Sequence, residues 1–597
     1  MRYTTLDSSA RQIRLLHLDP GKQETELECR LSSVSLEDIN LKYEALSYVW
    51  GESIEGRVIY VEGESKPVTD SLWRALRALR YWDKERTLWV DATCIDQSND
   101  DERSQQVALM YTIYTQASCV HIWLGEPFDN IELALQFFQD FAGVDLDARN
   151  LRSYVSPGLF DDSLEESTLS SEAKESIHTL TAIEKFMEAP WWTRTWTVQE
   201  FVLSKRAVFH CGMHTLNADT LMQCAWHLDR HTLFKCVCVI IPLGWKVQVE
   251  RSFQPLYLFM RLKSYHLSFI ECAGEVRLRF ASDPRDKIYG LLGLGADSMS
   301  GLVRPNYSMA VEEVYETLVI SLLKVTKVLD ILSHVKVEGH NKLLLPSFVP
   351  DWSSRASGEF DIWSPRQSLL CAYNTCLDTE ADFKAEPGVL FVRGRIYDIV
   401  QSVAIGSLGD PLSSIDTKIL DELLEFARIS PKHKDFEEKE ERFWIAMCAG
   451  ILPKDQDTPI QHDELQLQPI SANFQRISSL ERARYQKYDQ FIRSTDNGRL
   501  KTYMEGIDEL GDDQLRVAIT CAHSGRRGMA SERGSIGLVP MNARAGDVVA
   551  VLTGGRVPII LRPEAGYYTV VGDAYVHGIM DGEAMRDTNE LDWIEMH

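Results

Sequence analysis

The amino-acid sequence predicts an α/β fold, an open parallel sheet flanked by helices, followed by a mainly helical region and a C-terminal α+β or β-rich module. The main observation is the stretch LWVDATCIDQSNDDERSQQVALMYTIYTQASCVHIWLG at 88–125, which has the pattern strand, loop, helix, strand. Two buried strands joined by one helix form a βαβ unit, and such a unit favours parallel pairing. The second observation is a series of short apolar runs between Gly and Pro turns, which indicates a small β module at about 537–580.

Within the 88–125 stretch, each change of pattern has a local cause. The run Leu88–Val90 is apolar, and a polar loop is expected from Asp91 to residue 98. From about residue 100 apolar side chains recur at helical spacing, with Ser98 or Asn99 as the N-cap and acidic residues in the first turn. The run 119–124 then returns to a strand composition. The positions assigned to the buried helix face are Val107, Met110, Tyr111 and Tyr114.

The residues before this stretch add more strands and one helix. We expect strands at 13–18, 25–31, 43–51 and 57–61. A helix is expected from about Thr69 to Trp82, because four apolar residues fall on one face of it. They are Leu72, Ala75, Leu76 and Leu79. This alternation of strands and helices is typical of an open doubly wound sheet.

After residue 125 we expect a helix near 131–141, an exposed insertion at about 145–178 and a last strand at 206–211. Before that strand lies WWTRTWTVQEFVL at 191–203. At about 100° per residue, Trp196 and Glu200 share one helical face, whereas Val198 and Phe201 point the other way. The segment therefore separates a buried face from a face that carries an indole and a carboxylate.

The chain of 597 residues is too long for one hydrophobic core. We expect a first domain at 1–215 that includes the insertion, a mainly helical region at 216–338 and a mixed α+β domain at 339–597. The helical region contains DPRDKIYGLLG at 283–293. Its charged cluster is typical of a capped, salt-bridged helix start, and a catalytic role is the alternative.

Composition excludes several classes of protein. The net charge of -25 argues against a broad surface for nucleic acid or anionic membranes. The longest apolar run, 236–245, is broken by Pro242 and Gly244, so we expect no membrane span. The N-terminus lacks an apolar core of signal-peptide length, and we expect a soluble, cytoplasmic protein. The 12 cysteines are scattered, so we expect reduced, mostly buried thiols and no metal site.

Three sequence blocks resemble the fungal heterokaryon-incompatibility (HET) domain. They are YEALSYVWG at 43–51, the 88–125 stretch and WWTRTWTVQE at 191–200. Beyond them, three further blocks resemble the flanking regions of long fungal HET proteins, so the resemblance covers most of the chain. These blocks are DPRDKIYGLLGL at 283–294, LPSFVPDWS at 345–353 and YVHGIMDGE at 575–583.

The HET domain is itself similar to TIR domains, and this resemblance implies a TIR-like, flavodoxin-like open parallel sheet. The block 43–51 stands like the first TIR strand, and 88–91 matches the second strand with its terminal Asp. Trp196 and, four residues later, Glu200 match the TIR Trp and the Glu that cleaves NAD⁺ in enzymatic members. Thr197 replaces the usual Cys, and the insertion precedes the motif.

The resemblance implies cleavage of the N-glycosidic bond of NAD⁺, which would be a substrate and not a bound cofactor. The positive charge of the nicotinamide ring makes it a good leaving group, so one carboxylate, Glu200, is enough to stabilise the oxocarbenium-like centre. Aromatic faces attract the cationic ring, and the carboxyl ends of parallel strands form the rim where open α/β sheets bind ligands. The binding residues expected on this basis are Ser47, Tyr48, Trp50, Gly51, Asp91, Cys94 and Trp196.

Each of these residues also has a purely structural interpretation. Glu200 then pairs with Arg194 or another cation, the tryptophans fill the core, and Gly51 makes a turn. Cys94 as a nucleophile would need a general-base His, and the sequence identifies none near it.

Two main functions follow from the resemblance. The first is an immune-type effector of fungal non-self recognition, which stays inactive until it meets an incompatibility partner protein and then depletes NAD⁺ and kills the cell. The second is a non-enzymatic signalling module whose HET domain self-associates and recruits partners. A metabolic enzyme that has reused the fold is a third alternative, because fold does not fix function.

Overall fold

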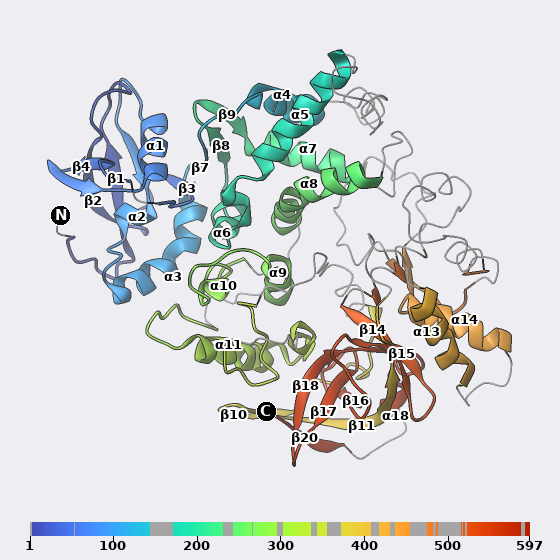
Figure 1. Cartoon of the computed structure of the whole chain (residues 1–597). Coiled ribbons are helices and arrows are strands. Elements are labelled where there is room, and N and C mark those ends of the chain that lie inside the picture. The colour runs from blue at the N-terminus through green and yellow to red at the C-terminus, as the bar shows by residue number, and fades with distance from the viewer. Residues whose placement is uncertain are drawn as a thin grey trace. The chain divides into compact units, whose positions relative to one another are not determined.

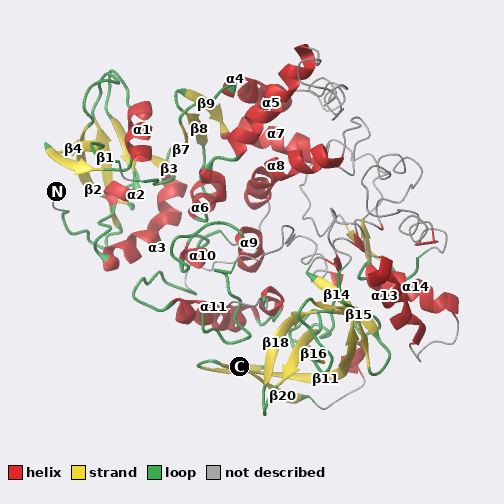
Figure 2. Ribbon diagram, viewed as in Figure 1, coloured by secondary structure: helices red, strands yellow, loops and turns green. Residues whose placement is uncertain are grey.

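We describe a computed structural model of the chain (Figures 1 and 2). It describes residues 3–597 except position 53 and the segments 144–170, 231–242, 265–266, 295–301, 336–342, 355–371, 408–416, 430–435, 454–473, 481–484, 487–514, 516–517, 520–521, 524 and 587–590. The chain forms two compact units, unit 1 (1–272 and 279–309) and unit 2 (273–278 and 310–597). This partition differs from the three predicted regions, whose boundaries near 215 and 338 stay predictions.

Unit 1 is built around a nine-stranded sheet with the order β5-β4-β2-β1-β6-β3-β7-β8-β9. Its strands are β1 Gln12–Leu18, β2 Glu28–Ser35, β3 Glu44–Tyr48, β4 Val58–Val61, β5 Glu64–Pro67, β6 Arg86–Trp89, β7 Val120–Gly125, β8 Ala207–Cys211 and β9 His214–Asn217. The four central strands β6, β3, β7 and β8 are parallel, as the βαβ pattern predicted. Along the chain they are the second, first, third and fourth strands of this core.

The predicted parallel sheet is confirmed for this core, but the strands on both sides of it make antiparallel pairs. β1 pairs antiparallel with both β2 and β6, and β9 returns antiparallel along β8. The strand at 207–211 is therefore not the last one, and β5, which pairs antiparallel with β4, was not predicted. Hydrophobic patterning identifies strands but does not set their direction or pairing, which depend on how the connections cross.

The helices of unit 1 flank this sheet (Figure 2). They are α1 Asp70–Leu79, α2 Asp91–Cys94, α3 Asp100–Gln116, α4 Ile131–Gly143, α5 Ser171–Met187, α6 Trp196–Val202, α7 Ala218–Arg230, α8 Leu243–Ser264, α9 Phe269–Val276, which crosses into unit 2, and α10 Asp286–Tyr289, with a 3₁₀ turn at Pro190–Thr193. Helix α3 packs against α6, and α6 packs against β3. Helices α3 and α6, which are far apart in the sequence, therefore meet next to β3.

The local signals for α1 and α3 act as predicted. The Thr69 side chain caps α1 by accepting from the amide of Leu72, and the four predicted apolar residues of α1 are buried. Asn99 is the cap of α3, where its side chain accepts from the amides of Asp101 and Glu102. The N-cap signals thus fix where both helices begin.

Three local predictions in unit 1 are wrong. The expected loop at 91–98 begins with the short helix α2, because the chain turns directly into a helical turn at Asp91. Residues 171–178 of the expected insertion are the first part of α5, whereas 145–170 lie outside the described residues. Tyr111 was expected on the buried face of α3 but is 45% exposed. The polar residue Gln106 is buried instead, and its side-chain amide donates a hydrogen bond to the carbonyl of Gln12.

Unit 2 contains a second nine-stranded sheet, of which part closes on itself. Its strands are β10 Phe383–Glu386, β11 Val389–Val403, β14 Arg526–Ser531, β15 Ile536–Pro540, β16 Val548–Leu552, β17 Ile559–Pro563, β18 Tyr568–Asp573, β19 Tyr575–Val576 and β20 Asp592–Met596, and β12 Ile451–Pro453 pairs separately with β13 Phe474–Arg476. The pairings β16–β17–β18–β20–β11 return to β16, so these five strands form a small barrel (Figure 1). Bulges in β11 at 396–398 and 400–402 allow one strand to pair with β16, β20 and β14.

The apolar runs that predicted the module at about 537–580 lie at 548–552, 557–561 and 568–571, and they correspond to β16, β17 and β18. The barrel also includes β11 and β20, which lie outside the predicted 537–580 module. The helical elements of unit 2 are α11 Val311–Thr326, α13 Thr417–Ile429, α14 Phe436–Met447 and α18 Glu583–Arg586, with a 3₁₀ turn at Asp330–His334. Sequence patterning indicated a strand at 389–393 but did not assign it, or β20, to the module, because a barrel is closed by segments that are far apart in the chain.

Candidate functional site at the carboxyl edge of β3

The candidate site lies where β3 and β6 end side by side. Ser47 and Tyr48 are the last residues of β3, and Asp91 follows β6 at the start of α2. Because β3 and β6 are parallel, these residues lie at the same edge of the sheet. Gly51 comes three residues after the end of β3 and has φ +68°, a left-handed conformation that favours glycine. This conformation agrees with the structural interpretation of Gly51 as a turn residue.

Helix α6 places Glu200 against this edge. The Ser47 hydroxyl donates a short hydrogen bond to Glu200 Oε2, and Ser47 Oγ accepts a hydrogen bond of 2.7 Å from the indole Nε1 of Trp191. All three residues are buried, with exposed fractions of 1% for Ser47, 7% for Glu200 and 0% for Trp191. The indole therefore fixes which way Ser47 points, and Ser47 in turn positions the carboxyl group.

This setting changes the ionisation of Glu200. The pKa of the Glu200 carboxyl is raised to about 8, mainly by burial and in addition by the negative charge of Asp91. The hydrogen bonds from Ser47 and Tyr114 and the positive charge of Arg194 act in the opposite direction. Glu200 thus holds a proton near neutral pH and becomes a carboxylate when the pH rises or when a cation binds beside it.

Trp50 and Asp91 form the outer part of the site. Trp50 Nε1 donates to Asp91 Oδ2 at 2.7 Å, and the amide of Ala92 donates to Asp91 Oδ1 at 2.7 Å. Burial raises the pKa of Asp91, and burial together with Asp91 raises the pKa of Tyr48. The Trp50 side chain is 36% exposed, so the hydrogen bond fixes the indole while part of the ring stays in contact with solvent.

Cys94 lies beneath this edge. Cys94 is the last residue of α2, its thiol is fully buried, and burial raises its pKa to about 11, so the thiol is neutral. Cys94 Sγ accepts a hydrogen bond of 3.3 Å from the amide of Val90. The predicted contact of Cys94 with a ligand stays a prediction.

Trp196 is joined to the motif at 283–293. It hydrogen-bonds Asp286, which also accepts a hydrogen bond of 2.7 Å from the Tyr307 hydroxyl. Burial raises the pKa of Asp286 to about 6. Arg285 and Asp283 form the ion pair expected at the start of α10. The motif therefore secures α6 from the side of Trp196, and the predicted role of this indole in ligand binding stays a prediction.

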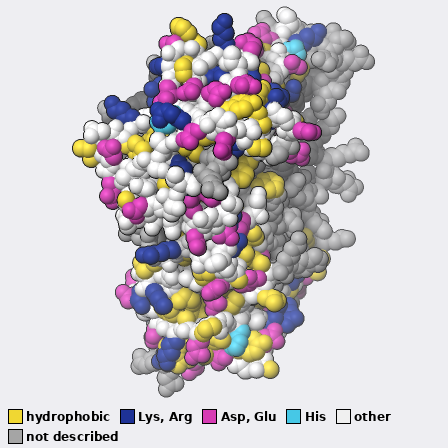
Figure 3. Space-filling model, turned by 90° about the vertical axis from the view of Figure 1, so that its left-hand side faces the viewer, with side chains coloured by type: hydrophobic (Ala, Val, Ile, Leu, Met, Phe, Trp, Pro, Cys, Tyr) yellow, Lys and Arg dark blue, Asp and Glu magenta, His cyan; other side chains and the backbone are white. Residues whose placement is uncertain are grey.

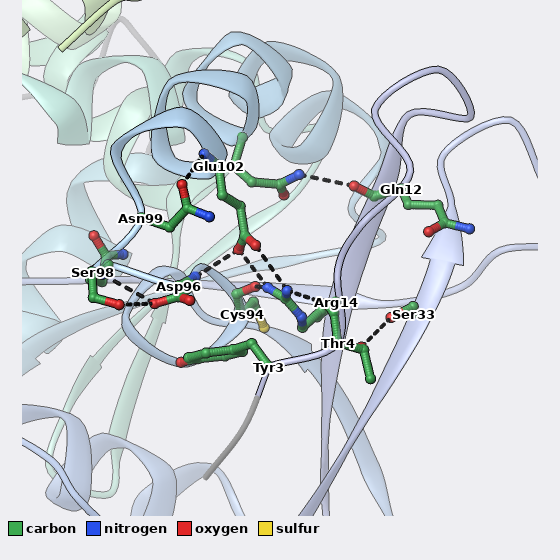
Figure 4. Close-up of polar contacts among 12 residues, drawn as sticks. Tyr3, Thr4, Gln12, Arg14, Ser33, Cys94, Asp96, Ser98, Asn99 and Glu102 are labelled. Carbon is green, nitrogen blue, oxygen red and sulfur yellow. Dashed lines mark hydrogen bonds and ion pairs between the residues drawn. The ribbon is translucent and has the colours of Figure 1, made fainter. Parts of the chain in front are cut away.

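A buried ion pair holds the chain that follows Asp91 (Figure 4). Arg14 on β1 donates to both carboxylate oxygens of Glu102, at 2.6 and 3.0 Å, and to the carbonyls of Cys94 and Thr4. Glu102 also accepts a hydrogen bond of 2.7 Å from the amide of Asp96. This network ties α2 and the start of α3 to β1, and it thereby fixes the position of Asp91 at the edge.

Sequence reasoning assigned Trp191 to the core and did not identify Tyr114 as part of the site. Trp191 does pack in the core, where it stacks on Phe259 with ring centroids 5.4 Å apart, but its indole nitrogen reaches Ser47. A buried Trp needs a partner for its N–H group, and this need is the signal that points to such a role. The sequence gives no indication of which acceptor it meets.

Other features limit the classes of site. Among the residues that the structure describes, no group of three or more His, Cys, Asp or Glu side chains is placed to hold a metal ion. In the same part of the chain, no helix is long and apolar enough to cross a membrane. The eight cysteines described are free, buried thiols, as predicted. On the face drawn in Figure 3, acidic and basic side chains are interspersed.

Comparison with known proteins adds the family. Residues 43–200 match the model of the family described as heterokaryon incompatibility protein (HET), and residues 451–594 match the Het-6 beta-barrel domain. The chain is similar to heterokaryon incompatibility protein 6, OR allele, of Neurospora crassa, with 26% identity over 98% of this chain and 96% of that protein. No solved structure matches the chain significantly. The resemblance found in the sequence blocks is therefore confirmed for both ends of the chain.

Proposed function

We propose that this chain, which matches the HET and Het-6 beta-barrel family models, acts in fungal non-self recognition and triggers the death of incompatible fused cells. The similarity to a heterokaryon incompatibility protein extends along nearly the whole chain, which supports a shared role of both units. We also propose that it acts in the cytoplasm, since free thiols are typical of a reducing compartment.

We further propose that unit 1 is a TIR-like NAD⁺ glycohydrolase. The observation that carries this proposal is the hydrogen bond between Ser47 at the end of β3 and Glu200 on α6. The parallel core has the strand order 2-1-3-4, which is that of flavodoxin-like sheets, and such sheets bind ligands at the carboxyl ends of their strands. Two polar groups that are distant in sequence therefore meet where this class of fold places its ligands.

The proposed reaction needs one carboxylate. Nicotinamide is expelled from NAD⁺ with the electron pair of the C–N bond, which neutralises its ring nitrogen, and water adds to the ribose carbon to give ADP-ribose and a proton. Glu200 as a carboxylate stabilises the positive charge that develops on the ribose. Before substrate binds, Glu200 is largely protonated at neutral pH because its pKa is about 8. The positive nicotinamide ring favours loss of that proton when it binds.

The surrounding residues have supporting roles in this proposal. The half-exposed indole of Trp50 offers a face to the nicotinamide ring, and its hydrogen bond to Asp91 holds that face in place. Ser47, oriented by Trp191, favours the charged form of Glu200 by donating to it. Trp191 is a positioning residue because it acts through Ser47.

The test uses fungal cells that express the full chain under conditions that trigger incompatibility. Wild-type protein should lower cellular NAD⁺ before the cells die, and Glu200→Gln should abolish both effects. Glu188→Gln is the matched control, because Glu188 is exposed and precedes the same motif. If Glu200→Gln cells die as fast as wild type with intact NAD⁺, the hydrolase proposal fails.

The burial of Glu200 favours a second candidate function. A carboxyl group that is only 7% exposed and bonded to Ser47 is also suited to a structural role in a domain that self-associates and recruits partners. In that case surface substitutions that prevent assembly should abolish toxicity, whereas Glu200→Gln should leave it unchanged. The same cell experiment therefore separates the two functions.

A further inference from the structure

Arg194 lies between the 3₁₀ turn at 190–193 and α6, and its backbone is held on several sides. Its carbonyl accepts hydrogen bonds of 2.8 Å from the Thr197 hydroxyl and 3.1 Å from Nη1 of Arg279. Its neighbours also pair with Phe280, whose amide donates to Thr193 and whose carbonyl accepts from Thr195. The position of the Arg194 backbone relative to α6 is therefore fixed.

The side chain of Arg194 is not held in the same way. Across the residues that the structure describes, its guanidinium forms no hydrogen bond within the chain and no ion pair within 4.0 Å. Other arginines of unit 1, such as Arg14 and Arg86, bind carboxylates or carbonyls directly. The Arg194 side chain is half-buried, and its nitrogen atoms are absent from the buried groups that lack partners, so they are in contact with solvent.

The guanidinium nevertheless lies at the candidate site. The amide of Arg194 donates to the carbonyl of Trp191 at 3.4 Å, and the indole of Trp191 donates to Ser47 at the site. The positive charge of Arg194 also lowers the pKa of Glu200, Asp91 and Tyr48. It thus lies at the β3 edge without an ion-pair partner, in a chain with 25 more acidic than basic residues. An anionic ligand of this acidic protein would need such a local cation.

We propose that Arg194 binds the diphosphate of a dinucleotide substrate, and this inference rests on the proposed hydrolase function. A guanidinium presents paired donors that match phosphate oxygens, and charge-assisted hydrogen bonds of this kind are strong. The backbone of Arg194 is held by hydrogen bonds, whereas its guanidinium has no carboxylate partner within the described part of the chain. The positive charge is therefore held near the site and is still available to bind an anionic ligand. The substrate class is then a pyridine dinucleotide, and nicotinamide riboside, which has no phosphate, lacks this contact.

The alternative is that Arg194 only adjusts the charge of Glu200. Substituting it would then slow turnover of NAD⁺ and nicotinamide riboside to the same degree and shift the pH profile, with KM unchanged. A diphosphate contact predicts a different result. Arg194→Gln should raise the KM for NAD⁺ by ~10- to 100-fold and leave the KM for nicotinamide riboside unchanged.

A binding experiment on the full chain tests the inference without relying on catalysis. Titration calorimetry with ADP-ribose should show binding to wild type, binding weakened ~10- to 100-fold in Arg194→Gln, and partial recovery in Arg194→Lys. Arg206→Gln is the control, because Arg206 is exposed, lies directly before β8 and should bind like wild type. Thermal melting of each variant checks that it is folded.

The outcomes separate this inference from the proposed function. If wild type binds ADP-ribose through Arg194 but releases no nicotinamide from NAD⁺, the hydrolase proposal fails and the binding site stands. If NAD⁺ is hydrolysed and folded Arg194→Gln binds ADP-ribose as wild type does, Arg194 is not the diphosphate contact. Absence of ADP-ribose binding to wild type also overturns the inference.

Discussion

Glu200→Gln is predicted to stabilise unit 1 at neutral and higher pH. The folded protein holds the Glu200 pKa at about 8, compared with an ordinary value of 4.5, because the carboxyl group is buried and lies near Asp91. The unfolded chain therefore releases this proton more readily than the folded chain, and stability is lost as the pH rises from 4.5 towards 8. At pH 7 the difference of 2.5 pH units from 4.5 corresponds to about 3 kcal/mol, at about 1.4 kcal/mol per unit.

Glutamine removes this loss because it stays neutral and still accepts the hydrogen bond from Ser47 through its amide oxygen. The stability of unit 1 should be measured for wild type and variant between pH 4.5 and 8, from the hydrogen exchange of the β3 amides at increasing urea concentrations. This readout reports on unit 1 alone, because β3 lies in its sheet. The advantage of the variant should be near zero at pH 4.5 and should grow with pH. A variant that is less stable than wild type at pH 7, or an advantage that does not change with pH, would refute the reasoning. Glu188→Gln should show neither effect.

Three further predictions concern other parts of unit 1. Glu102→Ala should destabilise the unit by about 3–5 kcal/mol in urea unfolding, because it leaves the buried Arg14 guanidinium without its carboxylate. Burial lowers the pKa of His210 to about 3, so this ring costs the folded protein stability as the pH falls from 6.5, and His210→Gln should gain about 2 kcal/mol relative to wild type between pH 6.5 and pH 5. Ser47→Ala removes the donor that favours ionised Glu200, so the midpoint of the pH profile of NAD⁺ hydrolysis should move above pH 8.

Each of these predictions has a contrary result. A loss below 1 kcal/mol for Glu102→Ala would show that the ion pair does not hold α2 and α3 in place. A stability difference between wild type and His210→Gln that does not change between pH 6.5 and 5, the range just below the ordinary pKa of His210, would show that this ring is not held neutral by the fold. An unchanged pH midpoint for Ser47→Ala would show that the Ser47 hydroxyl does not control the charge of Glu200.

Local sequence signals predicted the elements of unit 1 well where the cause was local. The cap at Asn99, the buried face of α1 and the parallel pairing around α3 follow from neighbouring residues. The antiparallel β1 and β9 were missed because pairing direction depends on distant segments. Tyr111 was placed wrongly because helical spacing alone gives it the same face as Met110 and Tyr114, whereas Gln106 is buried by a bond to a carbonyl on β1.

The candidate site shows the same division. Ser47 and Asp91 were expected at one edge because they follow strand ends, Glu200 was expected there because of the resemblance to TIR domains, and in the structure Glu200 bonds Ser47 at that edge. The link from Trp191 to Ser47 spans 144 positions, and the pair Arg14 and Glu102 spans 88. The sequence around Trp191 or Arg14 does not identify the acceptor that each side chain binds. A buried donor can pair with any acceptor that the fold brings close to it.

The central claim is that the carboxyl group of Glu200 cleaves NAD⁺. The most direct measurement is nicotinamide release from NAD⁺ by purified, concentrated full-length protein, compared among wild type, Glu200→Gln and Glu188→Gln at pH 7 and pH 8.5. We expect release by wild type and by Glu188→Gln that is faster at pH 8.5, and no release by a Glu200→Gln protein that is folded and at least as stable as wild type. Equal release by wild type and Glu200→Gln, or intact NAD⁺ with all three proteins, would contradict it.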